Sequence, residues 1–442
     1  MENQFWISES ECRNQYAIAT YLIESPLKPE EALIKIAKEQ SLSNWSGNPN
    51  KEQKIIKAYS AKGVTGSIKV FTINKAPSLS TNLALPNKAY YVFTAKIAFP
   101  IINFGGMLAT MYNTIVGEIH NIGVLTGIKV LDIKFPEPYL RNFRGPRFGI
   151  LGIRKILEEP VSPIFIGPVK PCVGLTPREF GKTAYEVLKG GFHIVKDDEL
   201  IVETSYSRFK DRVRETVKWV RKAEDETGRR KMYFAHIGGD SDAISKLFEI
   251  AVKADVDGIM LSPAINGLDI ANRFRGKLPI ITHNTLMYAS SRHPSLGVKF
   301  SLWSKLQRIA GADIMLTPAK FGSFDIMDEK EYLDNVETCW ENLFQYRTIF
   351  PAFSGSQSPI SLELHFRTLK KSDFIIVSGA AAYGHPMGGT AGAKSFVQAW
   401  TAVSSGITLS NYAKTREELR VSMETFGKDL IHLIEHKNRN GN

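Results

Sequence analysis

Short apolar runs recur along the chain from about residue 160 onward, and stretches with the apolar spacing of amphipathic helices separate them. Such an alternation of strand and helix is typical of a parallel sheet. Eight runs predict strands: residues 163–167, 192–195, 232–236, 258–262, 278–282, 313–317, 349–353 and 373–378. Eight units within about 270 residues are what a (β/α)8 barrel, the TIM-barrel form of the α/β class, requires. The alternative is a doubly wound open sheet, but no GxGxxG motif follows any run to support dinucleotide binding.

The first third of the chain predicts a mixed α+β domain. Residues 16–23 and 90–99 suit strands, and residues 67–73 alternate between apolar and polar types, as a half-buried strand does. Pro29 begins a helix whose apolar positions fall on one side. The basic segment 141–147, which contains glycine and proline, indicates a boundary near residue 145. We therefore expect an N-terminal α+β domain over residues 1–145 and the barrel over residues 146–442.

The composition is that of an ordinary soluble globular protein, with 442 residues of which 43% are hydrophobic and 23% charged. No N-terminal targeting segment is visible, and the most apolar stretch, residues 90–119, is interrupted by charged, proline and glycine residues, so we expect no membrane helix. The three cysteines are far apart and form no CxxC spacing. This favours a reduced, cytoplasmic protein without a cysteine-based metal site.

The net charge of +11 raises the question of nucleic-acid binding. The basic residues, however, are spread along the chain and mixed with acidic ones. Residues 208–231 predict a helix with one apolar stripe and with its charges on the other face. We therefore expect no nucleic-acid partner, and the positive charge instead helps to attract anionic, phosphorylated metabolites.

The second predicted barrel strand ends in Lys196-Asp197-Asp198-Glu199. Alternation along a strand places Lys196 and Asp198 on the same side, with Glu199 at the turn. Barrel enzymes carry their chemistry at this end of the strands, and converging carboxylates suit an oxygen-preferring cation such as Mg²⁺. The alternative is a solvated charge cluster in a loop.

Four other strand ends carry candidate residues. Lys170 follows the first strand and would act as a general acid or base if burial or a neighbouring cation lowered its pKa, whereas a solvent-directed lysine is the plain alternative. His283 ends the fifth strand. It would act as a proton shuttle, and the alternative is a core histidine whose hydrogen bonds are satisfied. The seventh and eighth strands end in small residues that let backbone N–H groups approach a phosphate: Ser354, Gly355, Gly379 and Ala380.

Three segments resemble motifs of the RuBisCO large-subunit superfamily. Residues 190–199 are similar to the family's GGxDFxKDDE motif, residues 169–175 to its KPxxGL motif, and residues 383–388 to its LGHPWG segment. The order and spacing match from about residue 16 to residue 404. The resemblance implies a ferredoxin-like N-terminal α+β domain, a C-terminal barrel, and a homodimer, or an oligomer of dimers, with shared active sites.

The resemblance also implies roles for individual residues. Lys196 would be carbamylated by CO₂ and would bind Mg²⁺ together with Asp198 and Glu199. Lys170 would match the family's proton-transferring lysine and His283 its catalytic histidine. Positions that contact substrate from the partner subunit fall on Glu39, Asn44, Trp45 and Glu118.

The chain departs from the family at positions that serve CO₂ fixation. A second active-site lysine is Cys172, the arginine after the fifth-strand histidine is Asn284, and the histidine at the end of strand six is matched to Met315. Residues 317–322 lack the glycine-rich pattern of the sixth loop, and Glu118 replaces an asparagine. The chain therefore resembles form IV, or RuBisCO-like, proteins, which do not fix CO₂.

Three functions remain open. The first is Mg²⁺-assisted enolisation or isomerisation of a phosphorylated ketose or keto compound, with the enolase of methionine salvage as one example. The second is decarboxylation or carbon–carbon cleavage of an oxo-sugar-acid phosphate, and the third is non-catalytic binding of a metabolite. Because neither Asn284 nor Met315 is cationic, we expect the substrate to carry one phosphate, with a neutral or partly apolar group at the other end.

Overall fold

The computed structural model describes residues 2–43, 49–79, 81–82, 84–85, 87–322, 327–430 and 433. The chain divides into two compact units. The first comprises Met1–Arg144 together with Leu286–Ala310, and the second comprises Gly145–Thr285 and Gly311–Asn442. None of the helices in the described part of the chain is long and apolar enough to cross a membrane.

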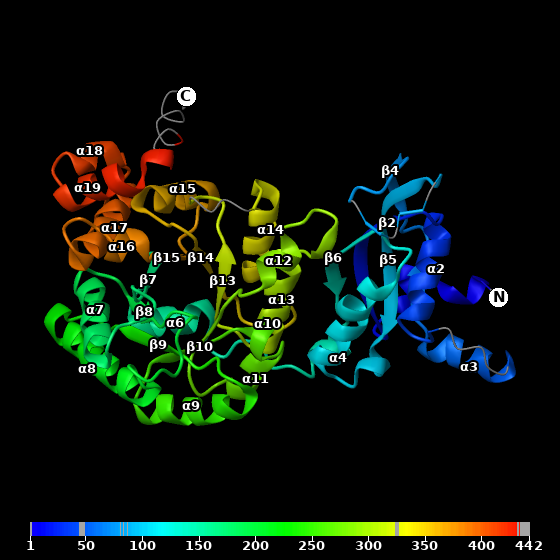
Figure 1. Ribbon diagram of the computed structural model, residues 1–442, viewed down its shortest axis with the longest axis horizontal. Coiled ribbons are helices and arrows are strands. Elements are labelled where there is room, and N and C mark those ends of the chain that lie inside the picture. The colour runs from blue at the N-terminus through cyan, green and yellow to red at the C-terminus, as the bar shows by residue number, and fades with distance from the viewer. Residues whose placement is uncertain are drawn as a thin grey trace. The chain divides into compact units, whose positions relative to one another are not determined.

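The second unit contains a closed barrel of eight parallel strands (Figure 1). Its strands are β7 (Ile164–Pro168), β8 (Ile194–Lys196), β9 (Met232–His236), β10 (Gly258–Leu261), β11 (Ile280–Thr282), β13 (Ile314–Pro318), β14 (Phe350–Ser354) and β15 (Ile375–Val377). The order around the barrel is β7-β8-β9-β10-β11-β13-β14-β15, and β15 pairs with β7 to close it. All eight predicted strands are confirmed, as is the TIM-barrel fold.

Alternate strand residues fill the inside of the barrel. Ile166, Ile194, Phe234 and Leu316 belong to one buried core cluster with residues from the other strands. Because side chains alternate at every second position, the next inward position on several strands lies at the carboxyl end of the barrel. Polar side chains are found there.

Helices follow the strands and surround the barrel, as Figure 1 shows for α7, α8 and α9. The helices of this unit are α6 (Gly149–Leu157), α7 (Pro177–Lys189), α8 (Phe209–Thr227), α9 (Ser241–Lys253), α10 (Pro263–Asn266), α11 (Ile270–Phe274), α14 (Glu329–Trp340), α15 (Pro359–Leu369), α16 (Ala380–Tyr383), α17 (Gly389–Ser404), α18 (Leu409–Ala413) and α19 (Glu417–Phe426). The start of α7 is set by Thr176 and Glu179, which form a capping box, and by Pro177 at the first helical position.

The first unit contains a mixed sheet, which confirms the predicted N-terminal α+β fold. Its strands are β1 (Trp6–Ile7), β2 (Tyr16–Ser25), β3 (Lys62–Val64), β4 (Lys69–Asn74), β5 (Tyr90–Pro100), β6 (Gly127–Lys134) and β12 (Leu296–Val298). The order is β1-β3-β5-β2-β6-β12, with β4 on β5. Its helices include α2 (Pro29–Glu39), α3 (Pro49–Tyr59), α4 (Leu108–Tyr112), α12 (Met287–Ser291) and α13 (Phe300–Ala310). The segment that follows Thr285 thus adds a strand to this sheet, which the single predicted boundary near residue 145 did not include.

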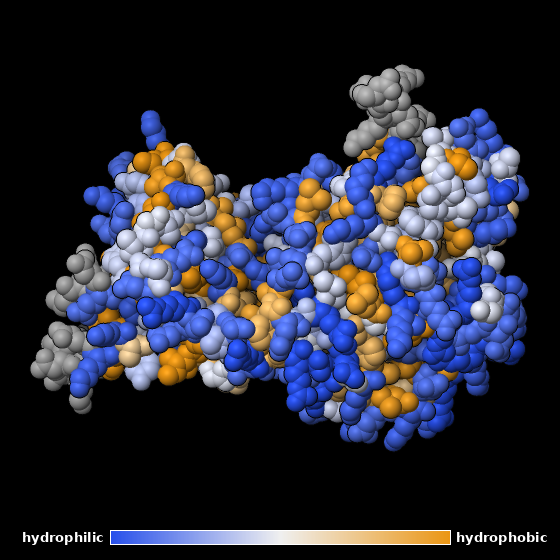
Figure 2. Space-filling view, turned by 180° about the vertical axis from the view of Figure 1, so that it is seen from behind, coloured by the Kyte–Doolittle hydropathy of each residue, from blue (hydrophilic) through white to orange (hydrophobic). Residues whose placement is uncertain are grey.

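Strand β4 exists as predicted, but its predicted half-burial is wrong. Val70, Phe71 and Ile73 are all exposed, Phe71 to 64%. The reason is position, because β4 pairs only with β5 at the side of the sheet and no described element covers its faces. Figure 2 shows apolar residues gathered on the surface over this strand, at the upper left.

Candidate active site

Lys196 ends β8 and continues the inward series of Ile194, so its side chain lies at the mouth of the barrel. The side chain is only 2% exposed. Its Nζ donates to the carbonyl oxygen of Asp197 at 3.0 Å and lies 3.4 Å from Glu199 Oε2. A buried lysine with one carboxylate neighbour is thus the centre of the predicted site.

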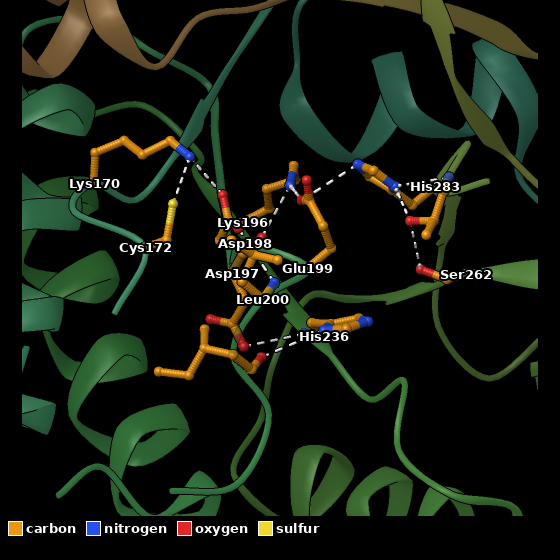
Figure 3. A network of polar contacts seen from close by, with 12 residues as sticks. Lys170, Cys172, Lys196, Asp197, Asp198, Glu199, Leu200, His236, Ser262 and His283 are labelled. Carbon is orange, nitrogen blue, oxygen red and sulfur yellow. Dashed lines mark hydrogen bonds and ion pairs between the residues drawn. The ribbon is translucent and has the colours of Figure 1, made fainter. Parts of the chain in front are cut away.

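Asp198 is paired with Lys170 across the gap between β8 and β7. Lys170 Nζ lies 2.6 Å from Asp198 Oδ2 and 2.8 Å from Cys172 Sγ, as the dashed lines in Figure 3 show. Burial alone would lower the pKa of Lys170, but Asp198 and Cys172 together raise it above its ordinary value. Lys170 therefore carries a proton here, opposite to the lowered pKa that a general base needs.

Glu199 joins Lys196 to His283 at the end of β11. His283 Nε2 lies 3.3 Å from Glu199 Oε2, and His283 Nδ1 lies 2.7 Å from the hydroxyl of Thr285. Burial alone would raise the pKa of Glu199, but the hydrogen bond with His283 and the ammonium of Lys196 hold it well below its usual range. Glu199 is therefore a carboxylate, and His283 is oriented from both sides.

Asp197 supports the cluster from the opposite face of β8. Its carboxylate accepts a hydrogen bond from the Tyr233 hydroxyl at 2.6 Å and one from the backbone N–H of His236 at 3.1 Å. Arg212 of α8 lies 3.5 Å from the same carboxylate, and both side chains are fully buried. The prediction that the charges of α8 all face away from its apolar stripe is wrong at Arg212, because Asp197 provides a buried partner that lies far from it in sequence.

Burial lowers the pKa of His236 to about 4, although the charge of Asp197 acts in the other direction. His236 is the inward residue at the end of β9. Because its pKa is so low, the ring is neutral near physiological pH. The sequence assigned no role at the site to Asp197, Arg212 or His236. The strand alternation that set Asp197 opposite Lys196 and Asp198 was the available signal.

Magnesium fits this donor set on one condition. Among the described residues, no three His, Cys, Asp or Glu side chains converge as a metal site. Asp198 and Glu199 supply two carboxylates, and each has a lysine ammonium beside it, Lys170 and Lys196. CO₂ addition to Lys196 would turn one of these cations into an anionic oxygen ligand and complete a set of the kind that Mg²⁺ prefers.

The small residues after β14 and β15 lie on another side of the same opening. Ser354 Oγ donates to the carbonyl of Thr317 at 3.3 Å. Gly379 lies against the side chain of Lys170, because a Cβ at Gly379 would meet Lys170 Cε at 3.2 Å. The next residue, Ala380, lines a cavity with Ser356. The ends of the first and eighth barrel strands therefore meet, and Gly355 and Ala380 remain predicted phosphate-binding positions.

The structure corrects the prediction for Met315. Met315 is fully buried, and its sulfur accepts a hydrogen bond from the Thr282 hydroxyl at 3.0 Å. Its neighbours Ile314 and Leu316 are in the barrel core cluster. Since Met315 lies away from that core and next to Thr282, it does not line the opening, and it cannot accept an apolar end of the substrate.

The remaining predicted residues lie in the first unit. Glu39 and Glu118 line one hollow, together with Lys35 and Asn121. Lys35 pairs with Glu39 at 3.4 Å, and Asn121 donates to Glu118 at 3.0 Å. Asn44 and Trp45, the other two predicted partner-subunit contacts, lie outside the described residues.

Comparison with known proteins identifies the family. A model of the catalytic domain of the ribulose bisphosphate carboxylase large chain matches residues 149–426, and a model of its N-terminal domain matches residues 4–139. The chain belongs to the RuBisCO large-chain family.

Within the RuBisCO family, relatives with RuBisCO-like names are similar to this chain. The ribulose bisphosphate carboxylase-like protein of Chlorobaculum tepidum is 32% identical over 421 residues, covering 94% of this chain and 95% of its own length. The crystal structure of a rubisco-like protein from Burkholderia fungorum shares 27% identity with a TM-score of 0.83, covering 93% of this chain and all of that one. A dimeric archaeal Rubisco from Hyperthermus butylicus has 27% identity and a TM-score of 0.82, covering 96% of this chain and 99% of that one. The predicted RuBisCO-like membership is confirmed.

Proposed function

We propose that this RuBisCO-family protein abstracts a proton next to a carbonyl of a phosphorylated ketose or keto compound, with Mg²⁺ as cofactor, and does not fix CO₂. The observation that carries the proposal is the cluster at three strand ends: Lys196 at the end of β8 with Asp198 and Glu199 just after it, Lys170 after β7, and His283 after β11. A protein that only bound a metabolite would have no use for two buried or half-buried lysines paired with carboxylates.

The chain's own residues divide the work. Asp198 and Glu199 would hold Mg²⁺ with the carbamate of Lys196, and the bound ion would supply positive charge to stabilise an enolate oxygen. Lys170 holds a proton at Nζ and is placed to deliver it to the substrate. Because Lys170 is already protonated, the carbamate of Lys196 would be the group that accepts the proton from the substrate carbon. His283, held by Thr285 through Nδ1 and by Glu199 through Nε2, is the second group able to move a proton.

This chain lacks residues that serve CO₂ fixation in the family. Cys172 stands where the family has a second active-site lysine, and in this structure its sulfur contacts Lys170. Asn284 replaces an arginine and is buried. Fewer cations at the opening favour a substrate with one phosphate, which the backbone at Ser354, Gly355, Gly379 and Ala380 would bind.

We also propose a homodimer in which each active site uses both subunits. The Rubisco of Hyperthermus butylicus is described as dimeric. Glu39 and Glu118 come from segments 79 positions apart, yet they line one hollow in the first unit. A hollow that collects the predicted substrate-contacting positions is what a site completed by a neighbouring subunit requires.

A screen of phosphorylated ketoses and keto acids in D₂O tests the proposal. Enolisation is expected to exchange deuterium into the carbon next to the carbonyl, only when Mg²⁺ is present. Release of CO₂ or a cleaved product in place of exchange would indicate decarboxylation or carbon–carbon cleavage. Labelled bicarbonate appearing in phosphoglycerate from ribulose bisphosphate, above the rate without enzyme, would contradict the exclusion of CO₂ fixation.

A further inference from the structure

A network of neutral, buried side chains lies beneath the loops that follow β13 and β14. At its centre is Gln357, which precedes α15 and is 1% exposed. Gln357 Nε2 donates to the carbonyl oxygen of Phe321 at 2.6 Å and to that of Gly355 at 3.0 Å. A single side-chain amide therefore joins the backbone of two loops that follow neighbouring barrel strands.

The other end of the Gln357 side chain is held by a directional chain of hydrogen bonds. Its Oε1 accepts from the Ser361 hydroxyl at 2.9 Å and lies 3.1 Å from His365 Nε2, while His365 Nδ1 lies 2.7 Å from the Tyr332 hydroxyl. An amide oxygen only accepts, so His365 carries its proton on Nε2 and accepts from Tyr332 at Nδ1. Burial lowers the pKa of His365 to about 3, which keeps the ring neutral. With its oxygen so occupied, Gln357 directs both N–H groups to the loops.

Packing holds the first loop at the same point. The Phe321 ring meets the His365 ring edge to face, with 5.1 Å between centroids. Gly322 has a φ of +150° and lies so close to the Gly355 carbonyl that a Cβ would stand 2.3 Å from its oxygen. Residues 321–322 are therefore fixed by a hydrogen bond, a ring contact and a backbone contact that only glycine allows.

We propose that Gln357 is a positioning residue that holds residues 319–322 against Gly355 and makes this side of the barrel opening a fixed wall of the substrate site. The effect of this wall on catalysis rests on the proposed function, whereas the rigidity of residues 319–322 does not. Gln357 also sets the orientation of a predicted phosphate-binding peptide. Because C=O and N–H point in opposite directions in a trans peptide, holding the Gly355 carbonyl inward turns the Ser356 N–H the other way.

Hydrogen exchange of residues 319–322 in the intact protein tests this without a substrate. Gln357→Met keeps the side-chain length and removes both donated bonds, so exchange at these residues is expected to rise about tenfold or more. Tyr332→Phe is the matched control, since it removes a hydroxyl from the same network and leaves both loop carbonyls bonded. It is expected to change exchange there less than about threefold. Equal exchange in the wild type and Gln357→Met would overturn the proposal.

A second variant covers the case in which Gln357→Met does not fold. Gly322→Ala keeps every side chain of the network but places a methyl group against the Gly355 carbonyl, which forces the two loops apart and weakens the bonds from Gln357 to both, so residues 319–322 are expected to exchange faster. Unchanged exchange in this variant would also overturn the proposal.

A kinetic measurement separates positioning from a structural role. With whichever substrate the D₂O screen finds, Gln357→Met is expected to raise KM while kcat stays nearly constant, because the residue orients binding groups and moves no proton. If Gln357→Met and Tyr332→Phe lower kcat and raise KM to the same extent as each other, the network has a structural role alone. If wild-type protein is inactive throughout the screen, the proposed function fails, and the exchange experiment still decides whether the loop is fixed.

Discussion

Two sides of the same barrel opening are built in opposite ways. At the ends of β7, β8 and β11, two lysines and a histidine lie 2.6–3.4 Å from carboxylates, and these are the groups proposed to move protons. At the ends of β13 and β14, neutral side chains centred on Gln357 hold backbone carbonyls. The charged side suits chemistry that creates negative charge, whereas the neutral side suits precise placement of a ligand without added charge.

Substitutions on the charged side should reduce activity the most. Lys196→Ala should lower deuterium exchange into the substrate at least about a hundredfold, as the loss of one preorganised electrostatic group commonly does. The matched control is Lys189→Ala. It removes an exposed lysine of α7 that pairs with Glu226 of α8, and it should keep wild-type activity. Full turnover by Lys196→Ala would show that the charged side is not the reaction centre.

In the proposed homodimer, residues of a second chain complete the active site on the charged side. A Lys196→Ala chain and a Glu39→Ala/Glu118→Ala chain should each be inactive alone. After mixing, about a quarter of wild-type activity is expected, because half of random dimers are heterodimers with one intact site of two. Activity should be followed together with mass by analytical ultracentrifugation. An active monomer, or no recovery in verified heterodimers, would refute sharing.

The neutral side should be visible in the pH dependence of stability. His365 has a folded pKa of about 3, below its ordinary 6.5, so the unfolded chain binds the proton first as pH falls. Stability from this residue is complete above about pH 6.5 and falls by about 1.4 kcal/mol per pH unit down to about pH 3. In urea unfolding measured from pH 7 to pH 5, His365→Gln should make the slope shallower by about that amount, while the part due to His236, whose pKa burial also lowers, remains. An identical slope in wild type and variant would show that His365 is protonated in the folded state.

The smallest effect is expected at Met315. Because its side chain is buried away from the opening, Met315→Leu should cost less than about 1.5 kcal/mol of stability and leave substrate KM unchanged. Thermal unfolding and steady-state kinetics of the same preparation measure both quantities. A change of KM by an order of magnitude would restore Met315 to the substrate site.

The barrel could be predicted from the sequence because its strands are local apolar runs, and the cluster at Lys196, Asp198 and Glu199 because strand ends share one side of the barrel. The prediction for Met315 was wrong because a family position does not say to which face of the strand a side chain points. Alternation from Ile314 and Leu316 would have placed it outside.

Non-local pairs explain what the sequence pattern could not predict. From its place in the helix pattern, Arg212 is expected to face solvent, and only the fold brings Asp197 beside it. Gln357 is likewise expected to be an ordinary loop residue, and only the fold places Phe321 and His365 within hydrogen-bond distance of it. The segment after Thr285 likewise joins the N-terminal sheet through pairing of β12 with β6, far from it in sequence. The exposure of Phe71 depends on the absence of a covering element over β4 in the described structure, which strand periodicity does not report.

Lys196, Asp198 and Glu199 are proposed to form a magnesium site completed by CO₂. Calorimetric titration of Mg²⁺ into the protein, with and without bicarbonate, tests it without any substrate. We expect saturable binding of one Mg²⁺ per chain that is strengthened by bicarbonate and absent in Lys196→Ala. Equal Mg²⁺ affinity without CO₂, or undiminished binding by Lys196→Ala, would contradict it.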